Sequence, residues 1–295
     1  MGKAIGRIGM IGGSGLGEAL AGRTHGEARY EETPFGYPSG PVVLSELEGV
    51  EIAFLARHGE GHWLNPSSVP YRANIYALKR VGVTHIIAGG ATGSLAEEIA
   101  PRELVIPDQV IDKTFKRQNS FFDGELAVHV DFAYPFCERL RRLLLSAAGQ
   151  IDARVHEKGT YVCMEGPQFS TRAESQLHRA WGGHLIGMTV MPEAKLAREA
   201  EICYALVALP TDYDCWRDHK GNADKHDLLS EIVGHLQAAT QNAIQLITRA
   251  LTQAEAFLSE PCEHHQALEP AIWTDKGCIT EASREKLGLL IGKYL

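Results

Sequence analysis

The stretch "CYALVALPTDYDCW", residues 203–216, joins an apolar run to two acids, Asp212 and Asp214. The run "CYALVALP" shows no polar alternation, which is typical of a strand that is covered on both faces of a sheet. Such a strand seldom ends in two acids with one residue between them. In α/β proteins the carboxyl ends of the strands form the ligand site, so these acids predict a binding role.

Runs of the same kind recur along the chain and predict further strands. They lie at 7–12, 41–47, 50–57, 83–90, 103–111, 159–166 and 184–189. Helical patterns lie between them or after them, at 70–82, after the predicted capping box of Thr171 and Glu174, and at 192–203, 228–258 and 280–294. The alternation predicts an α/β fold, a single domain with a central mixed β-sheet flanked by helices.

The bulk composition argues against several classes of protein. The chain has 295 residues, 22% charged residues and a formal net charge of -8, with no cluster of Lys and Arg. This excludes nucleic acid or an anionic membrane as the main partner. The start does not resemble a signal peptide, and no apolar run is long enough to span a bilayer. The six cysteines are far apart without a C-x-x-C pair, which predicts reduced thiols, a cytoplasmic location and no structural zinc site.

Three strand ends carry groups suited to an anion. Ser14 lies in the glycine-rich "IGGSGLG" after the first strand, and Arg57 and His58 open "RHGEGH" after another. The stretch "GGATGS" extends 83–90 with glycines and small hydroxyls. Backbone amides, arginine and hydroxyls suit a phosphate. The alternatives are a tight turn at Ser14 and a charged loop at Arg57. The glycines around His62 argue against a metal pair with His58.

Two further strand ends favour a planar base. Phe169 lies in the Gly-Pro loop "EGPQFS", where an aromatic ring offers a stacking surface. Met188 and Thr189 end the strand at 184–189. Carboxylates such as Asp212 and Asp214 accept hydrogen bonds, which favours an amino-substituted ring.

With these motifs in order, the chain resembles the trimeric purine nucleoside phosphorylase family over residues 5–255. The resemblance rests on "IGMIGGSGLG", "TPFGYPS", "LARHGEGHWLNPSSVPYRANIYALK", "GATGSLAEEIAP", "YVCMEGPQFSTRAES", "GMTVMPEAKLAREA" and "TDYDCW". It implies a phosphorylase domain at 1–255 and a C-terminal extension at 256–295 packed on that domain. It also implies a homotrimer.

The resemblance implies a role for each matching residue. Phosphate is held by Ser14, Arg57, His58, the Ala91 backbone and Thr189. The base contacts Phe169, Ser170, Asp212 and Asp214, and the ribose contacts Met188. The 5′ substituent meets His62, His129 from a neighbouring subunit, and the apolar face of Leu229, Ile232 and Val233. Asp212 and Asp214 are the expected catalytic residues, with Asp212 placed to protonate N7 of the leaving purine.

The implied reaction is phosphorolysis of 5′-methylthioadenosine to adenine and 5-methylthioribose 1-phosphate. Inorganic phosphate is the co-substrate, and neither a metal nor an organic cofactor is required. The alternative is a broader purine nucleoside phosphorylase acting on adenosine, inosine and guanosine. That class typically has Glu and Asn at the base site, whereas this chain has Ser170 and Asp212, which favours a 6-amino ring. A hydrolase and a purine-binding sensor without turnover are further rivals.

The chain departs from the family pattern in three places. Gly90 stands where relatives often carry Thr or Asn. Lys225 and His226, in the long segment "RDHKGNADKHD", form either a solvated loop or a polar contact to the 5′ group. The extension at 256–295 has no counterpart in the motifs.

Overall fold

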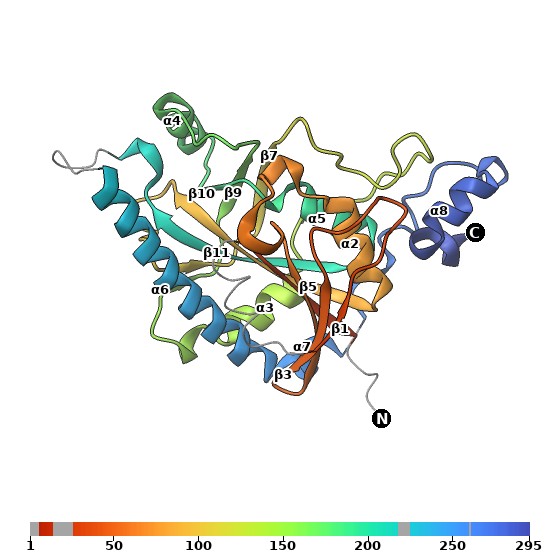
Figure 1. The fold of residues 1–295 in the computed structure, drawn as a ribbon, viewed down its shortest axis with the longest axis horizontal. Coiled ribbons are helices and arrows are strands. Elements are labelled where there is room, and N and C mark those ends of the chain that lie inside the picture. Colours follow the sequence, from red (N-terminus) through yellow and green to blue (C-terminus); the bar gives the residue numbers. More distant parts are fainter. Residues whose placement is uncertain (1–5, 14–25, 218–224, 260) are drawn as a thin grey trace.

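The fold was analysed in a computed structural model, which describes residues 6–13, 26–217, 225–259 and 261–295 (Figure 1). Its strands form one mixed sheet in the order β2-β3-β4-β1-β5-β10-β9-β7, in which β11 also pairs with β5 and β6, and β8 with β6. The strands are β1 (Arg7–Gly12), β2 (Glu27–Arg29), β3 (Val42–Leu47), β4 (Val50–Ala56), β5 (Val83–Ser94), β6 (Leu104–Val105), β7 (Gln109–Lys113), β8 (Val155–His156), β9 (Thr160–Met164), β10 (Leu185–Gly187) and β11 (Cys203–Asp212).

Helices cover both faces of this sheet. They are α2 (Tyr71–Arg80), α3 (Glu138–Ser146), α4 (Arg172–Ala180), α5 (Val190–Glu199), α6 (Lys225–Leu251), α7 (Ala254–Leu258) and α8 (Glu281–Ile291). Helices α2 and α5 pack against each other on one face, while α3 packs against α6 and α7 on the other (Figure 1). The predicted fold class, a single domain with a mixed sheet flanked by helices, is confirmed.

Strand β11 explains why the run at 203–210 has no polar alternation. Tyr204, Leu206 and Ala208 belong to the core on one face, and Ala205 and Val207 belong to the core on the other. Because successive side chains of a strand point to opposite faces, burial on both sides requires an apolar residue at every position.

The C-terminal residues contribute to the same two cores. Leu287, Leu290 and Ile291 of α8 pack into the core under α2 and α5. Leu258 and Cys262 pack into the core under α3 and α6. The segment 256–295 is therefore held against the sheet by apolar contacts on both faces.

Several boundaries differ from the sequence prediction. Strand β5 continues four residues past Gly90, because β11 and β10 both pair with its far end. The run at 103–111 is two strands, β6 and β7, which pair with different partners. Helix α5 begins before Pro192, and the helix predicted at 228–258 is divided after Leu251. Strands β2 and β8 and helix α3 were not predicted. None of the described helices has the length and apolar character needed to cross a membrane.

Candidate active site

The carboxyl ends of four strands meet at one edge of the sheet. Strand β1 pairs in parallel with β4 and β5, and β5 pairs in parallel with β11. The pairing continues just past the strand ends. The Arg57 N–H after β4 donates to the Gly12 carbonyl of β1 at 2.9 Å, and the Gly13 N–H after β1 donates to the Gly89 carbonyl of β5 at 3.3 Å. Asp212 lies opposite Gly93 at the end of β11. The sheet thus brings the predicted anion-binding loops and the two acids to a common edge.

Arg57 is fully buried and already has a partner. Its Nε and Nη2 donate to the two carboxylate oxygens of Glu193 at 2.7 and 2.8 Å, and its Nη1 donates to the Gly89 carbonyl at 2.9 Å. The Tyr204 hydroxyl also donates to Glu193, at 2.7 Å. Glu193 raises the pKa of Arg57 above its usual range, so the guanidinium is charged and rigid. Glu193 therefore matches the Arg57 charge within the chain, and the predicted contact of Arg57 with phosphate stays a prediction.

The Nη1 edge of Arg57 still faces the predicted phosphate position. A Cβ atom on Gly13 would lie 2.7 Å from Nη1, and a Cβ atom on Gly90 would lie 4.0 Å from it. The same Cβ on Gly90 would be 3.6 Å from the Thr189 hydroxyl. Gly13 thus allows the backbone to pass close to Arg57, and Gly90 lies against both Arg57 and Thr189. Ala91 follows in β5, opposite Leu209, whereas Ser14 lies outside the described residues.

His58 and His62 stack face to face rather than converging on a common point. Their ring centroids are 4.1 Å apart with planes 22° from parallel. His58 Nδ1 lies 2.8 Å from the Leu64 carbonyl, which only accepts, so Nδ1 carries the proton and Nε2 of the neutral ring has a free lone pair. Burial and the neighbouring Arg57 charge lower the pKa of His58 to about 4. Near neutral pH the site therefore presents an acceptor from His58, not a donor.

The two acids of the opening stretch are held in fixed orientations. Asp212 accepts a hydrogen bond from the Thr211 hydroxyl at 2.7 Å and from the Asp214 N–H at 2.9 Å. The buried Ser175 hydroxyl of α4 donates to Asp214. Asp214 has a positive φ of 46° and packs over Gly93, where an added Cβ would lie 3.2 Å from its own Cβ. Gly93 therefore permits the turn that places Asp214 beside Asp212.

The predicted base-binding loop lies against this turn. Cys215 Sγ contacts the Ser170 carbonyl at 3.3 Å, which places the Ser170 backbone next to the turn that carries Asp214. Trp216 anchors the turn by donating from Nε1 to the Ser94 carbonyl at 2.8 Å. The Phe169 ring is 85% exposed. It has a free face in this chain, as a stacking platform requires, but packing does not fix the ring.

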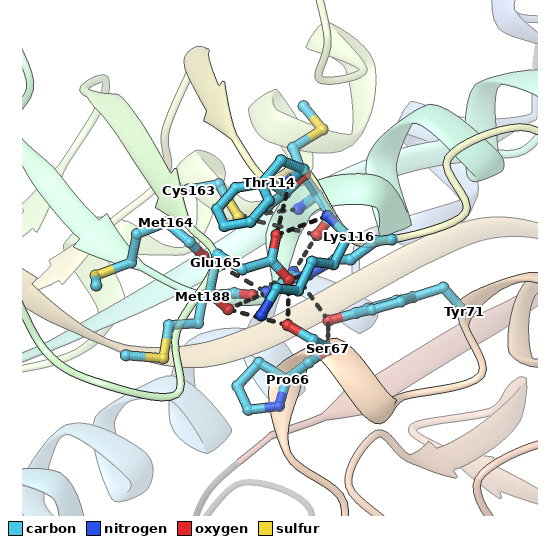
Figure 2. Close-up of polar contacts among 12 residues, drawn as sticks. Pro66, Ser67, Tyr71, Thr114, Lys116, Cys163, Met164, Glu165 and Met188 are labelled. Atoms are coloured by element: carbon cyan, nitrogen blue, oxygen red, sulfur yellow. Dashed lines mark hydrogen bonds and ion pairs between the residues drawn. The ribbon is translucent and has the colours of Figure 1, made fainter.

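Arg117 organises the backbone around Met188, which lies close to Glu165 and Ser67 in one network of polar contacts (Figure 2). Its Nη1 donates to the Met188 carbonyl at 2.6 Å, and its guanidinium also pairs with Glu165 at 3.3 Å. Glu165 in turn accepts from Ser67 and from the backbone N–H of Phe115. The Met188 side chain lies over Gly166, where a Cβ atom would be 2.6 Å from its sulfur. This network fixes the position of the predicted ribose contact.

Helix α6 contacts the end of β11, next to the two acids. His235 Nδ1 lies 2.9 Å from the Thr211 carbonyl, which ties the helix to the end of β11. The predicted apolar face lies one and two turns before this contact, and Leu229 and Val233 are 59% and 44% exposed while Ile232 is partly buried. His226 is exposed, and the side chain of Lys225 lies outside the described part of the chain.

His129 lies on the segment between β7 and α3, which extends toward α8 (Figure 1). It is exposed, and its ring packs edge-on against Trp273 of the C-terminal segment at 4.8 Å. The described contacts do not join His129 to Asp212 or Arg57. Its predicted role in a neighbouring subunit stays a prediction.

The sequence reasoning missed the residues that support the site, namely Arg117, Glu165, Ser175, Glu193 and His235. Glu193 left a signal, since it directly follows the apolar residues Val190, Met191 and Pro192, and a buried acid needs a partner. The others depend on contacts between segments far apart in sequence and left no comparable signal.

Comparison with known proteins agrees with this geometry. A sequence model of the phosphorylase superfamily matches residues 7–252, and the chain belongs to that family. A curated relative from Geobacter sulfurreducens, named S-methyl-5′-thioadenosine phosphorylase, is 48% identical over 98% of this chain and 99% of its own length. A relative of the same name from Gloeobacter violaceus is 45% identical over 98% of this chain and 96% of its own.

Solved structures show the same likeness. A methylthioadenosine phosphorylase from an antarctic soil metagenomic library superimposes with a TM-score of 0.87 at 43% identity, covering 98% of this chain and 99% of that one. The methylthioadenosine phosphorylase of Schistosoma mansoni in complex with adenine gives a TM-score of 0.82 at 34% identity, covering 90% and 99%.

Proposed function

We propose that this protein catalyses the phosphorolysis of 5′-methylthioadenosine, releasing adenine and 5-methylthioribose 1-phosphate. The observation that carries the proposal is the division of one sheet edge into two halves. Arg57 and Thr189 meet beside Gly90 and suit an anion, and Asp212 and Asp214 lie at the end of the neighbouring strand pair. The names of the relatives support the same substrate.

The chemistry follows from the placement of these groups. A phosphate oxygen attacks C1′ of the ribose while the bond from C1′ to N9 of the purine breaks. The electron pair of that bond goes to the purine, and Asp212, ionised at rest, takes a proton from water and passes it to N7. The phosphate dianion stabilises the cationic sugar of the transition state. Phosphate thus serves as both nucleophile and counter-charge.

Specificity is expected at both ends of the nucleoside. The carboxylates of Asp212 and Asp214 accept hydrogen bonds, which favours a 6-amino over a 6-oxo purine. The exposed apolar face of Leu229, Ile232 and Val233 favours an apolar 5′ substituent. A broader purine nucleoside phosphorylase would need a donor at the base site, and neither aspartate provides one when ionised.

The remaining features of the proposal concern the assembly. We infer a cytoplasmic homotrimer in which His129 completes the 5′ pocket of a neighbour. The reaction needs no metal and no organic cofactor, because phosphate and the side chains supply the charges and the proton.

The test is a comparison of substrates with and without phosphate. The protein is incubated with methylthioadenosine, adenosine and inosine, and release of the free base is followed. We expect phosphate-dependent release of adenine, fastest from methylthioadenosine. Equal release without phosphate indicates a hydrolase, faster release from inosine indicates the broader phosphorylase, and binding without release indicates a sensor.

A further inference from the structure

Three cysteines far apart in sequence meet at the end of β11 opposite the candidate active site. Cys137 precedes α3, Cys203 begins β11, and Cys262 follows α7. Together with His264 they form a buried group whose sulfur and nitrogen atoms all lie within 4.8 Å of one another. We propose that these four residues bind one Zn²⁺ ion as a structural site. The spacing argument against zinc in the sequence does not apply, because the ligands come from three separate segments.

The distances fit a tetrahedral zinc–thiolate site. Two sulfurs bound to one zinc ion at about 2.3 Å with a tetrahedral angle lie about 3.8 Å apart. Cys137 Sγ and Cys262 Sγ are 3.7 Å apart. The backbone also holds Cys137 close to Cys203. The Cys137 N–H donates to the carbonyl of Tyr204, the residue after Cys203, at 2.8 Å. Four protein ligands close the coordination sphere, as in structural rather than catalytic zinc sites.

The two adjacent histidines have different roles. His265 Nε2 lies 3.2 Å from the Thr84 carbonyl, which only accepts, so this nitrogen carries a proton. The same nitrogen is 3.5 Å from Cys203 Sγ, where it acts as an outer donor to the sulfur. Nε2 of His264 instead accepts a hydrogen bond from Arg198 at 2.9 Å and carries none. His264 is therefore the candidate fourth ligand, and His265 stabilises a thiolate.

Arg198 supplies the charge that a three-thiolate site requires. Its side chain is buried and donates to the carbonyls of Asp131 and Tyr134 and to the ring of His264, with the Asp131 carboxylate among the charges near it. A zinc ion with three thiolates and a neutral histidine carries one negative charge, which Arg198 offsets.

Metal binding requires a defined exchange of protons and hydrogen bonds. The three thiols lose three protons as three Zn–S bonds form. The bond between Arg198 and His264 must break whichever nitrogen binds zinc. If Nε2 binds zinc, it uses the lone pair that now accepts the hydrogen bond from Arg198. If Nδ1 binds zinc, the ring proton moves to Nε2, which then cannot accept a hydrogen bond. The freed N–H of Arg198 can then donate to a thiolate sulfur.

The site would fasten the C-terminal segment to the sheet. Cys262 and His264 belong to the residues after α7, whereas Cys137 and Cys203 belong to the body of the fold. Strand β11 separates Cys203 from Asp212 by nine residues, about 30 Å in extended form. The zinc site is therefore independent of the proposed reaction, and its loss should lower stability without changing the rate of the folded enzyme.

The experiment measures metal content and ligand identity on the full chain. The protein is purified under reducing conditions, loaded with Zn²⁺, freed of excess metal and analysed by mass spectrometry of the element. We expect one zinc ion per chain, retained in Cys278→Ser, a control at an exposed cysteine. Cys262→Ser should lose stoichiometric zinc, and His264→Ala should bind it at least about 10-fold more weakly. Turnover of nucleoside should be unchanged in each folded variant.

Cobalt provides a second readout that does not depend on the folding of a variant. Co²⁺ bound to the unmodified chain should give the absorption bands of a tetrahedral thiolate complex. Three results would overturn the proposal: a loaded chain without bound metal, zinc retained in Cys262→Ser, or a disulfide between two of the three cysteines. The first would mean that the thiols are only small apolar core residues.

Discussion

Replacing Glu193 by glutamine tests how the Arg57 charge is balanced. Arg57 and Glu193 are 0% and 1% exposed, and the pair is held by two hydrogen bonds of 2.7 and 2.8 Å. The amide keeps one acceptor oxygen but turns an NH₂ group toward an N–H of Arg57. The variant thus loses one charge-assisted hydrogen bond and leaves a buried charge without its partner. Breaking a buried ion pair in this way costs about 3–5 kcal/mol.

Phosphate should recover part of that loss. In Glu193→Gln the dianion becomes the main counter-charge of Arg57, so it should bind more tightly to the folded state. A tenfold gain in affinity adds about 1.4 kcal/mol of stabilisation at a fixed, saturating phosphate concentration. The measurement is thermal or urea unfolding with and without phosphate. We expect a lower melting temperature than in the unmodified protein, and a larger upward shift on adding phosphate.

Tyr204→Phe is the matched control. It removes the third hydrogen bond to Glu193, 2.7 Å long, and leaves the ion pair intact. We expect a loss of about 1 kcal/mol and an unchanged response to phosphate. If both variants lose the same stability, or phosphate stabilises both equally, Arg57 does not depend on Glu193 and does not face the anion.

Four further outcomes are expected. Asp212→Asn should slow adenine release by about 10²- to 10⁴-fold. It should also reduce the difference in rate of base release between methylthioadenosine and inosine, and an unchanged rate would show that Asp212 is not catalytic. Gly90→Thr should lower the KM for phosphate about fivefold through one added hydrogen bond of about 1 kcal/mol, whereas a raised KM would show that the space is needed empty. His58 is neutral at pH 7 because its pKa is about 4, and the dianion raises that pKa. Above the second pKa of phosphate, where the free ligand is already the dianion, binding should therefore take up a proton and strengthen as pH falls. Calorimetry in two buffers of different ionisation enthalpy would show this uptake for the unmodified chain but not for His58→Gln. Mixed trimers of His129→Ala and Asp212→Ala should regain activity after subunit exchange, and no recovery despite exchange would place His129 outside the site.

The sequence predicted the strands most reliably where burial on both faces dictates composition. The run at 203–210 forms β11, and 7–12 forms β1 without any shift. The capping box of Thr171 and Glu174 is also confirmed. These features are local, because a few neighbouring residues determine them. Strand β8 is different: it has two residues and forms only by pairing with β6, so no periodic pattern could reveal it.

The candidate site divides in the same way. The predicted site residues, such as Asp212 and Thr189, lie at the ends of apolar runs that the sequence identifies as strands. The partners that fix them come from distant segments: Ser175 reaches Asp214 from α4, and Glu193 reaches Arg57 across 136 positions. The sequence did not predict the group of three cysteines and His264 for the same reason, because its residues come from three separate segments. Ligand-spacing motifs such as C-x-x-C describe ligands on one segment, so they cannot predict a site whose ligands come from distant segments.

Helix α6 has two parts that differ in how firmly the fold holds them. From Ala239 to Leu251 it packs into the core, whereas the residues before His235 are mostly exposed on the side of the two acids. The hydrogen bond from His235 to Thr211 marks the boundary. Amide hydrogens before this boundary can exchange by fraying of about three turns, while those after it exchange only when the core opens. Under the proposed function, the 5′ end of the nucleoside would thus enter and leave at the cost of local fraying, and the rest of the molecule would stay folded.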